Sequence, residues 1–191
     1  MTNRCLLHIC LILLFSTEIS SLHCTALYFQ QNKLNQDSLE LLEKMRGNFP
    51  SQCINERTAF KPTQDIVQLP LSQKENVKMT VQGLLQEIFS IFSKNLTQTS
   101  WDRSLIDFQN GLHLQIQMLK TCLSAEMEME ITHPRNENLL LTTRLKLKRY
   151  FQTIHDFLKE KQYSLCAWEI IRLEIFRCFP VLDMLTKRLE N

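Results

Sequence analysis

The scarcity of glycine and proline is the strongest constraint on how this chain can fold. Only 3 glycines and 5 prolines occur among its 191 residues. β-Sandwiches, β-barrels and nucleotide-binding α/β folds use many more of these residues in tight turns and phosphate-binding loops. The length is sufficient for one domain with a hydrophobic core and short for two. We therefore expect a single all-helical domain.

The N-terminus has the three-part pattern of a secretory signal peptide. Arg4 precedes an apolar run from Cys5 to Phe15, and small and polar residues follow from Ser16 to Ser21. The run is too short to span a bilayer, and no later segment has the ~20 apolar residues that a spanning helix needs. We expect cleavage between residues 21 and 23, with an uncleaved anchor as the alternative. Residues 24–191 are then a secreted, extracellular domain without membrane insertion.

The charge gives no indication of a charged partner. The net charge is +2, and removal of the signal peptide takes away one basic and one acidic residue, Arg4 and Glu18. Four basic residues near position 146 are interleaved with leucines and are typical of a solvated helix face. Neither nucleic acid nor an anionic membrane is indicated.

Five cysteines remain after residue 23, at positions 24, 53, 122, 166 and 178. An oxidising compartment then permits two disulfides and one free thiol, and the sequence alone does not choose the pairs. No C-x-x-C or H-x-x-x-H spacing indicates a metal site, and we expect no cofactor. Asn95-Leu96-Thr97 is a glycosylation sequon. A secreted context favours a glycan on Asn95, and an unused sequon is the alternative.

Helical periodicity occurs in five segments. The first extends from Thr25 to Met45 with an apolar stripe at Leu27, Leu34, Leu41 and Met45, and a long irregular connection follows to Leu71. Ser72 opens the second helix with a capping box and Ser100 caps the third. Residues 126–138 indicate a loop or frayed helix. The fourth helix covers Leu139 to Gln162, and the fifth begins at Ser164 with a kink or early end at Pro180.

Apolar stripes on five helices and a long first connection favour a bundle with crossover topology, as in helical cytokines. In the last helix the stripe predicted to face the core consists of Ala167, Ile171, Ile175, Cys178, Leu182, Leu185 and Leu189. Residues about 100° to 240° away from Ile171 then lie outside. These are Glu169, Arg172, Leu173, Phe176 and Arg177.

Leu173 and Phe176 are therefore expected in water, flanked by Arg172 and Arg177. A single exposed leucine or phenylalanine is ordinary. Two of them one helical turn apart, beside guanidinium groups, are typical of a protein-binding hot spot.

Catalysis is not indicated. The chain has no G-x-S-x-G, glycine-rich phosphate loop or H-E-x-x-H. His113, His133 and His155 fall on three different segments and do not form a ligand pattern. We expect a protein that is not an enzyme.

Two segments resemble the type I interferon family. They are Tyr150-Phe151-Gln152-Thr153-Ile154-His155-Asp156-Phe157-Leu158 and, after seven residues, Cys166-Ala167-Trp168-Glu169-Ile170-Ile171-Arg172. The C-A-W segment at this spacing is highly specific. The similarity extends over nearly the whole chain and includes Phe49-Pro50-x-x-Cys53, Ile88-Phe89-Ser90-Ile91-Phe92 and Trp101.

The resemblance implies a monomeric five-helix cytokine that bridges two different receptor chains, so that Janus kinases and STAT proteins start an antiviral programme of innate immunity. It implies that the tighter chain contacts Ile54, Arg57, Arg172, Leu173, Phe176 and Arg177. The second chain would contact Phe89, Ser90, Lys94, Leu105 and Lys148. Asn110 and Leu114 occupy positions at which some relatives carry tyrosines.

The resemblance also implies disulfides that join Cys24 to Cys122 and Cys53 to Cys166, with Cys178 as a free core thiol. Two rival functions remain at this point. One is a four-helix hormone or cytokine of another family, which would share the bundle but lack the C-A-W pattern. The other is a secreted carrier of an apolar ligand, against which the outer Leu173 and Phe176 argue.

Overall fold

The computed structural model describes residues 24, 26, 29–45, 51–60, 74–93, 101–129 and 137–190. Within these ranges the chain forms five long helices and no strand. They are an N-terminal helix (residues 29–44), α3 (Lys74–Phe92), α4 (Asp102–Met129), α5 (Glu137–Glu160) and α6 (Leu165–Glu190). A short 3₁₀ turn, η1 (Ser51–Cys53), leads into α2 (Ile54–Ala59). The all-helical bundle that the sequence predicted is confirmed.

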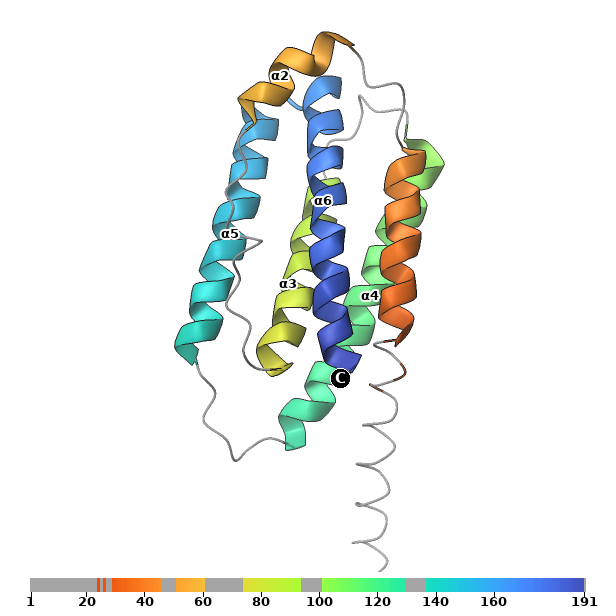
Figure 1. Ribbon diagram of the computed structural model, residues 1–191, viewed down its shortest axis with the longest axis vertical. Helices are drawn as coiled ribbons and strands as arrows, with labels where there is room; N and C mark the ends of the chain where they lie inside the picture. The colour runs from red at the N-terminus through yellow and green to blue at the C-terminus, as the bar shows by residue number, and fades with distance from the viewer. Residues whose placement is uncertain are drawn as a thin grey trace, which may run out of the picture.

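The helices form an elongated bundle (Figure 1). The N-terminal helix, α3 and α5 run upward in that view, and α4 and α6 run downward. The first two long helices thus run in the same direction, which requires the long first connection that the sequence predicted. α3 packs against three of the other long helices, α4, α5 and α6. α2 lies across one end and contacts α6.

The core consists of the stripes predicted for the later helices. Every predicted apolar position of α6 is buried, from Ala167 to Leu189. In α3 the predicted stripe is buried in full, at Val77, Val81, Leu84, Ile88, Ile91 and Phe92, and Leu85 is buried beside it. Phe92 lies among the rings of Trp101, Phe108 and Trp168, with centroid distances of 5.1 to 6.2 Å. These aromatic contacts join α3 to the start of α4 and to α6.

The buried face of the N-terminal helix differs from the predicted one. Leu34 and Leu41 are only half-buried, whereas Gln31, Asn35 and Ser38 are 1% exposed. Their side chains have polar partners: Gln31 donates to Gln115, Gln115 to Ser38, and Asn35 to Thr186. Because hydrogen bonds offset the cost of burying amides, a helix can bury a polar face that hydrophobic periodicity does not detect.

Two disulfides join distant parts of the chain. Cys24 pairs with Cys122, and Cys53 pairs with Cys166, with Cα atoms 5.6 and 5.1 Å apart. These are the pairs that the family resemblance implied. Cys178 is free and buried.

The structure differs from the expected boundaries at three places: the first connection is partly helical, residues 126–129 are helical and not a loop, and α6 has no early end at Pro180. The first connection contains η1 and α2, and α4 continues through residues 126–129, where a loop or frayed helix was expected. α6 continues past Pro180 to Glu190. Pro180 is exposed, and burial of Leu182, Leu185 and Leu189 on the opposite side stabilises the final turns. Residues 1–23, Ser72, Lys94, Asn95 and Ser100 lie outside the described residues.

Candidate receptor-binding surface

The Cys53–Cys166 disulfide determines where α2 lies. Cys53 directly precedes α2, and Cys166 is in the first turn of α6. At the other end of α2, the rings of Phe60 and Phe157 have centroids 4.9 Å apart, which connects α2 to α5. A covalent bond and an aromatic contact thus hold this six-residue helix across the start of α6 (Figure 1).

A shallow pocket lies where α2 meets α6. Its lining residues are Arg57, Phe60, Ile170, Leu173, Glu174 and Arg177. Arg57 is therefore brought beside Leu173 and Arg177, although more than a hundred positions separate them in the sequence. We call this pocket and its rim the α2–α6 surface, including Ile54, which is 55% exposed, and Phe176, which is half-buried.

Two α6 residues that were expected on the outer side of the helix are buried instead, and one of them, Arg172, was an expected receptor contact. Arg172 is 2% exposed and Glu169 is 4% exposed. The Nε atom of Arg172 donates to Glu169 Oε2 over 3.1 Å, and its Nη1 donates to the carbonyl oxygen of Leu42 over 2.9 Å. Trp101 Nε1 donates to the other Glu169 oxygen over 3.3 Å.

The predicted exposure of Arg172 was wrong because α6 is covered on more than its apolar face. The end of the N-terminal helix, with the Leu42 carbonyl, and the start of α4, with Trp101, meet its polar flank. Carbonyls in the last turn of a helix have no partner within the helix, and a cation near them is stabilising. Arg172 therefore serves as an internal connection between helices.

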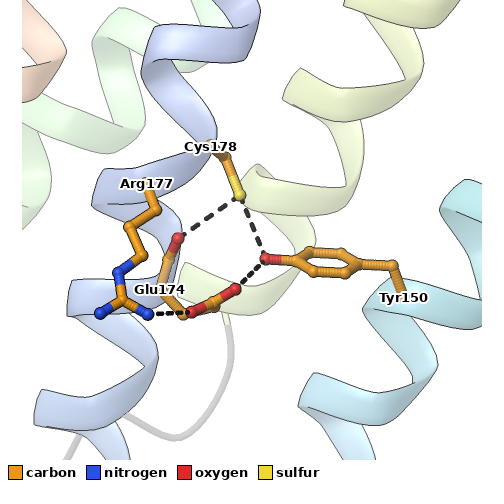
Figure 2. A network of polar contacts seen from close by, with 4 residues as sticks. All are labelled: Tyr150, Glu174, Arg177 and Cys178. Atoms are coloured by element: carbon orange, nitrogen blue, oxygen red, sulfur yellow. Dashed lines mark hydrogen bonds and ion pairs between the residues drawn. The ribbon is translucent and has the colours of Figure 1, made fainter. Parts of the chain in front are cut away.

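Arg177 has a different environment, because its side chain is 61% exposed. Its Nη1 donates to Glu174 Oε2 over 3.3 Å. Glu174 is buried, and its Oε1 accepts a 2.8 Å hydrogen bond from the Tyr150 hydroxyl on α5. Figure 2 shows this chain of contacts from Tyr150 through Glu174 to Arg177, with Cys178 beside it.

Cys178 and Tyr150 are protonated in this cluster. The Cys178 Sγ lies 3.3 Å from the Tyr150 hydroxyl and donates to the Glu174 carbonyl over 3.5 Å. Burial raises the pKa of the Cys178 thiol to about 12, and burial also raises the pKa of the Tyr150 hydroxyl far above its ordinary value. A thiol that keeps its proton is a poor nucleophile. Burial therefore leaves the Cys178 thiol without activation as a nucleophile.

The residues expected to bind the second receptor chain are distributed over three helices. Phe89 and Ser90 on α3 and Leu105 on α4 are half-buried, and Lys148 on α5 is exposed. The Phe89 ring faces His113 on α4, with centroids 6.0 Å apart. Lys148 instead lines a groove with α3 residues that include Gly83 and Glu87. Phe89 and Lys148 are thus on different flanks of α3.

Some residues of these surfaces were not predicted from the sequence. Glu174 and Phe60 line the α2–α6 pocket, and His113 contacts Phe89. The spacing of Glu174 three residues before Arg177 was a usable signal, because side chains at i and i+3 meet on a helix. Phe60 belongs to the family pattern that begins at Phe49-Pro50-x-x-Cys53, but it was not predicted as a surface residue. Among the described residues, no group of three His, Cys, Asp or Glu side chains could hold a metal ion.

Residues 27–189 match the interferon alpha/beta domain. The chain is 38% identical over 193 residues to interferon beta of Homo sapiens and 37% identical over 192 residues to interferon beta of Tachyglossus aculeatus aculeatus. Both alignments cover 100% of each protein. Among solved structures, zebrafish interferon 1 is similar with a TM-score of 0.68 and 22% identity, covering 86% of this chain and 99% of that one. This structural likeness concerns the fold.

Proposed function

Because the chain belongs to the interferon alpha/beta family, we propose that this helical cytokine is secreted and bridges two different receptor chains on the cell surface. Bridging brings Janus kinases together, and STAT proteins then start an antiviral programme. The protein acts as a monomer and is not an enzyme. The two receptor chains contact two separate faces of the bundle.

The tighter receptor chain binds the α2–α6 surface. The main support is the single pocket that unites Arg57 on α2 with Leu173 and Arg177 on α6. Apolar side chains with arginines at their margin are typical of binding hot spots. Ile54, Arg57, Leu173, Phe176 and Arg177 are the contact residues. Arg172 contributes indirectly, because its guanidinium group is buried against Glu169 and Leu42.

The second receptor chain binds the face formed by α3, α4 and α5. Phe89, Ser90 and Leu105 are half-buried and Lys148 is exposed, so each offers some surface to a partner. The family resemblance also assigns Lys94 to the contact with the second receptor chain. The α2–α6 surface uses other helices, so both receptor chains can bind at once.

A signal peptide is removed by cleavage between residues 21 and 23, so Cys24, which pairs with Cys122, stays in the mature protein. None of the described helices combines the length and hydropathy required to cross a membrane. Secretion is tested by sequencing the N-terminus of the protein recovered from the culture medium. An N-terminus at residue 22 or 24 supports cleavage, and an intact Met1 on cell membranes contradicts it.

Receptor binding is tested by titrating residues 24–191, refolded with both disulfides, against each isolated receptor ectodomain. Arg57→Ala and Arg177→Ala should each weaken binding to the tighter chain about thirtyfold, the effect of losing a hot-spot anchor. Lys148→Ala should weaken only the second interaction. Arg188→Ala is the matched control, because Arg188 is an exposed arginine near the far end of α6.

Equal affinities for the Arg177→Ala and Arg188→Ala variants would exclude the α2–α6 surface as the binding site. Binding of neither ectodomain by the refolded wild-type protein would contradict the proposed function itself.

A further inference from the structure

The Glu174 carboxylate connects a buried hydroxyl to an exposed guanidinium group. One oxygen accepts the 2.8 Å hydrogen bond from Tyr150, and the other accepts the 3.3 Å contact from Arg177. The Glu174 side chain is 9% exposed and the Arg177 side chain 61% exposed. The carboxylate therefore lies at the boundary between core and surface, with one partner on each side (Figure 2).

We propose that Tyr150 is a positioning residue for receptor binding: through Glu174 it holds the exposed Arg177 guanidinium in the orientation that the tighter receptor chain meets. This inference rests on the proposed function, because Arg177 is one of the proposed receptor contacts. Tyr150 itself is 3% exposed and does not touch a partner.

An ordinary surface ion pair would not hold Arg177 in this way. Two exposed side chains both lose rotamer freedom when they pair, so such contacts are weak and mobile. The exposed pair of Lys187 and Asp183 on the same helix is of this kind, with side chains 58% and 28% exposed. Glu174 differs because burial and the Tyr150 hydroxyl already fix its carboxylate. Only Arg177 then has to become ordered.

The position of Tyr150 is itself fixed by the fold. The turn 161–164 reverses the chain between α5 and α6, with Gln162 and Tyr163 at positive φ of 50° and 55°. Ser164 precedes α6 and caps it, because its hydroxyl accepts a hydrogen bond from the Ala167 amide. The reversal places Tyr150 on α5 beside Glu174 and Cys178 on α6.

Cys178 completes the cluster without competing for the carboxylate. The single Tyr150 hydroxyl hydrogen is donated to Glu174, so the thiol hydrogen remains available for the tyrosine oxygen or the Glu174 carbonyl. The high pKa of both groups keeps these hydrogens in place at physiological pH. Arg177 is thereby pre-organised, which lowers the entropy lost when a partner binds.

The test is a double-mutant cycle of Tyr150→Phe and Arg177→Ala, read out as affinity for the ectodomain of the tighter receptor chain. Tyr150→Phe should weaken binding about two- to tenfold, the usual gain from ordering one flexible side chain beforehand. In the Arg177→Ala background it should cause no further loss. An equal loss in both backgrounds would show a general structural role and overturn the proposal, as would no loss in either.

Tyr163→Phe is the matched control, because it removes the hydroxyl of a half-buried tyrosine in the turn before α6, whose ring centroid lies 6.2 Å from that of Trp168. It should leave the affinity unchanged. If Tyr150→Phe does not fold, Glu174→Gln replaces it in the cycle. Glutamine keeps an acceptor for Tyr150 but carries no charge for Arg177, and it should weaken binding only when Arg177 is present.

A receptor-independent measurement separates failure of this proposal from failure of the proposed function. Nitrogen-15 relaxation of the Arg177 Nε–H should show a rigid side chain in the wild type and a more mobile one in Tyr150→Phe. If Arg177→Ala binds normally but Tyr150→Phe mobilises Arg177, the proposed surface is wrong and the positioning is correct. Unchanged relaxation in Tyr150→Phe overturns the positioning in every case.

Discussion

Replacing Arg172 with methionine should destabilise the fold and leave the α2–α6 surface in place. The substitution keeps much of the side-chain volume and removes the charge. The Glu169 side chain is 6% exposed, so its carboxylate stays buried after the substitution. Of the contacts described above, it then keeps only the hydrogen bond from Trp101 Nε1 at 3.3 Å. The substitution also removes the hydrogen bond to the Leu42 carbonyl.

Breaking a buried ion pair from one side costs about 3 to 5 kcal/mol, because the other charge stays buried without compensation. For a domain of this size, 1 kcal/mol corresponds to roughly 2 to 4 °C in melting temperature, so Arg172→Met should melt about 10 °C below the wild type. Arg177→Ala should cost less stability than Arg172→Met, because the Arg177 guanidinium is 61% exposed and already largely hydrated, and Glu174 keeps its hydrogen bond from Tyr150.

The assay is urea unfolding of the oxidised protein, followed by circular dichroism, for both variants and the wild type. Adding Glu169→Gln to Arg172→Met should recover part of the lost stability, since the uncompensated charge is then removed. An Arg172→Met variant that unfolds within about 0.5 kcal/mol of the wild type would refute the burial of this ion pair.

Three further outcomes are expected. Ile175→Ala should lower the unfolding free energy by about 2 to 5 kcal/mol by creating a cavity, since Ile175 is 0% exposed; wild-type stability in urea unfolding would contradict this packing. Burial raises the pKa of the Cys178 thiol from 9.0 to about 12, so the folded chain binds this proton more tightly than the unfolded chain. The unfolding free energy should therefore fall as pH rises from 9 towards 12, by up to about 1.4 kcal/mol per pH unit from this group, and Cys178→Ala should remove that part of the slope. Asn95 should carry a glycan, so treatment of the secreted protein with an N-glycan amidase should lower its mass and convert Asn95 to Asp; an unchanged mass would exclude the modification.

Hydrophobic periodicity correctly predicted the buried faces of those helices that bury apolar side chains. The stripes of α3 and α6 are buried as expected because burial of Leu, Ile and Phe side chains stabilises one phase of each helix over the others. The N-terminal helix was predicted less well, since Gln31, Asn35 and Ser38 occupy its buried face. Their hydrogen-bond partners are on α4 and α6, and a pattern read along one helix cannot reveal them.

The candidate site shows the same limit. Helical phase correctly placed Arg177 outside, but it placed Arg172 outside as well. The difference depends on the Leu42 carbonyl and on Trp101, which approach Arg172 and Glu169 only after folding. The juxtaposition of Arg57 with α6 came from the family resemblance, and the Cys53–Cys166 disulfide supplies its physical basis.

The central claim is that one molecule binds two receptor chains at once on separate faces. The most direct measurement immobilises the ectodomain of the tighter chain, captures residues 24–191, and then adds the second ectodomain. We predict that the second ectodomain binds in addition and gives a 1:1:1 complex. When an equal amount of the Lys148→Ala variant is captured instead of the wild type, this additional binding should be lost. Displacement of the captured protein by the second ectodomain would show that both receptors compete for one face and would contradict the account.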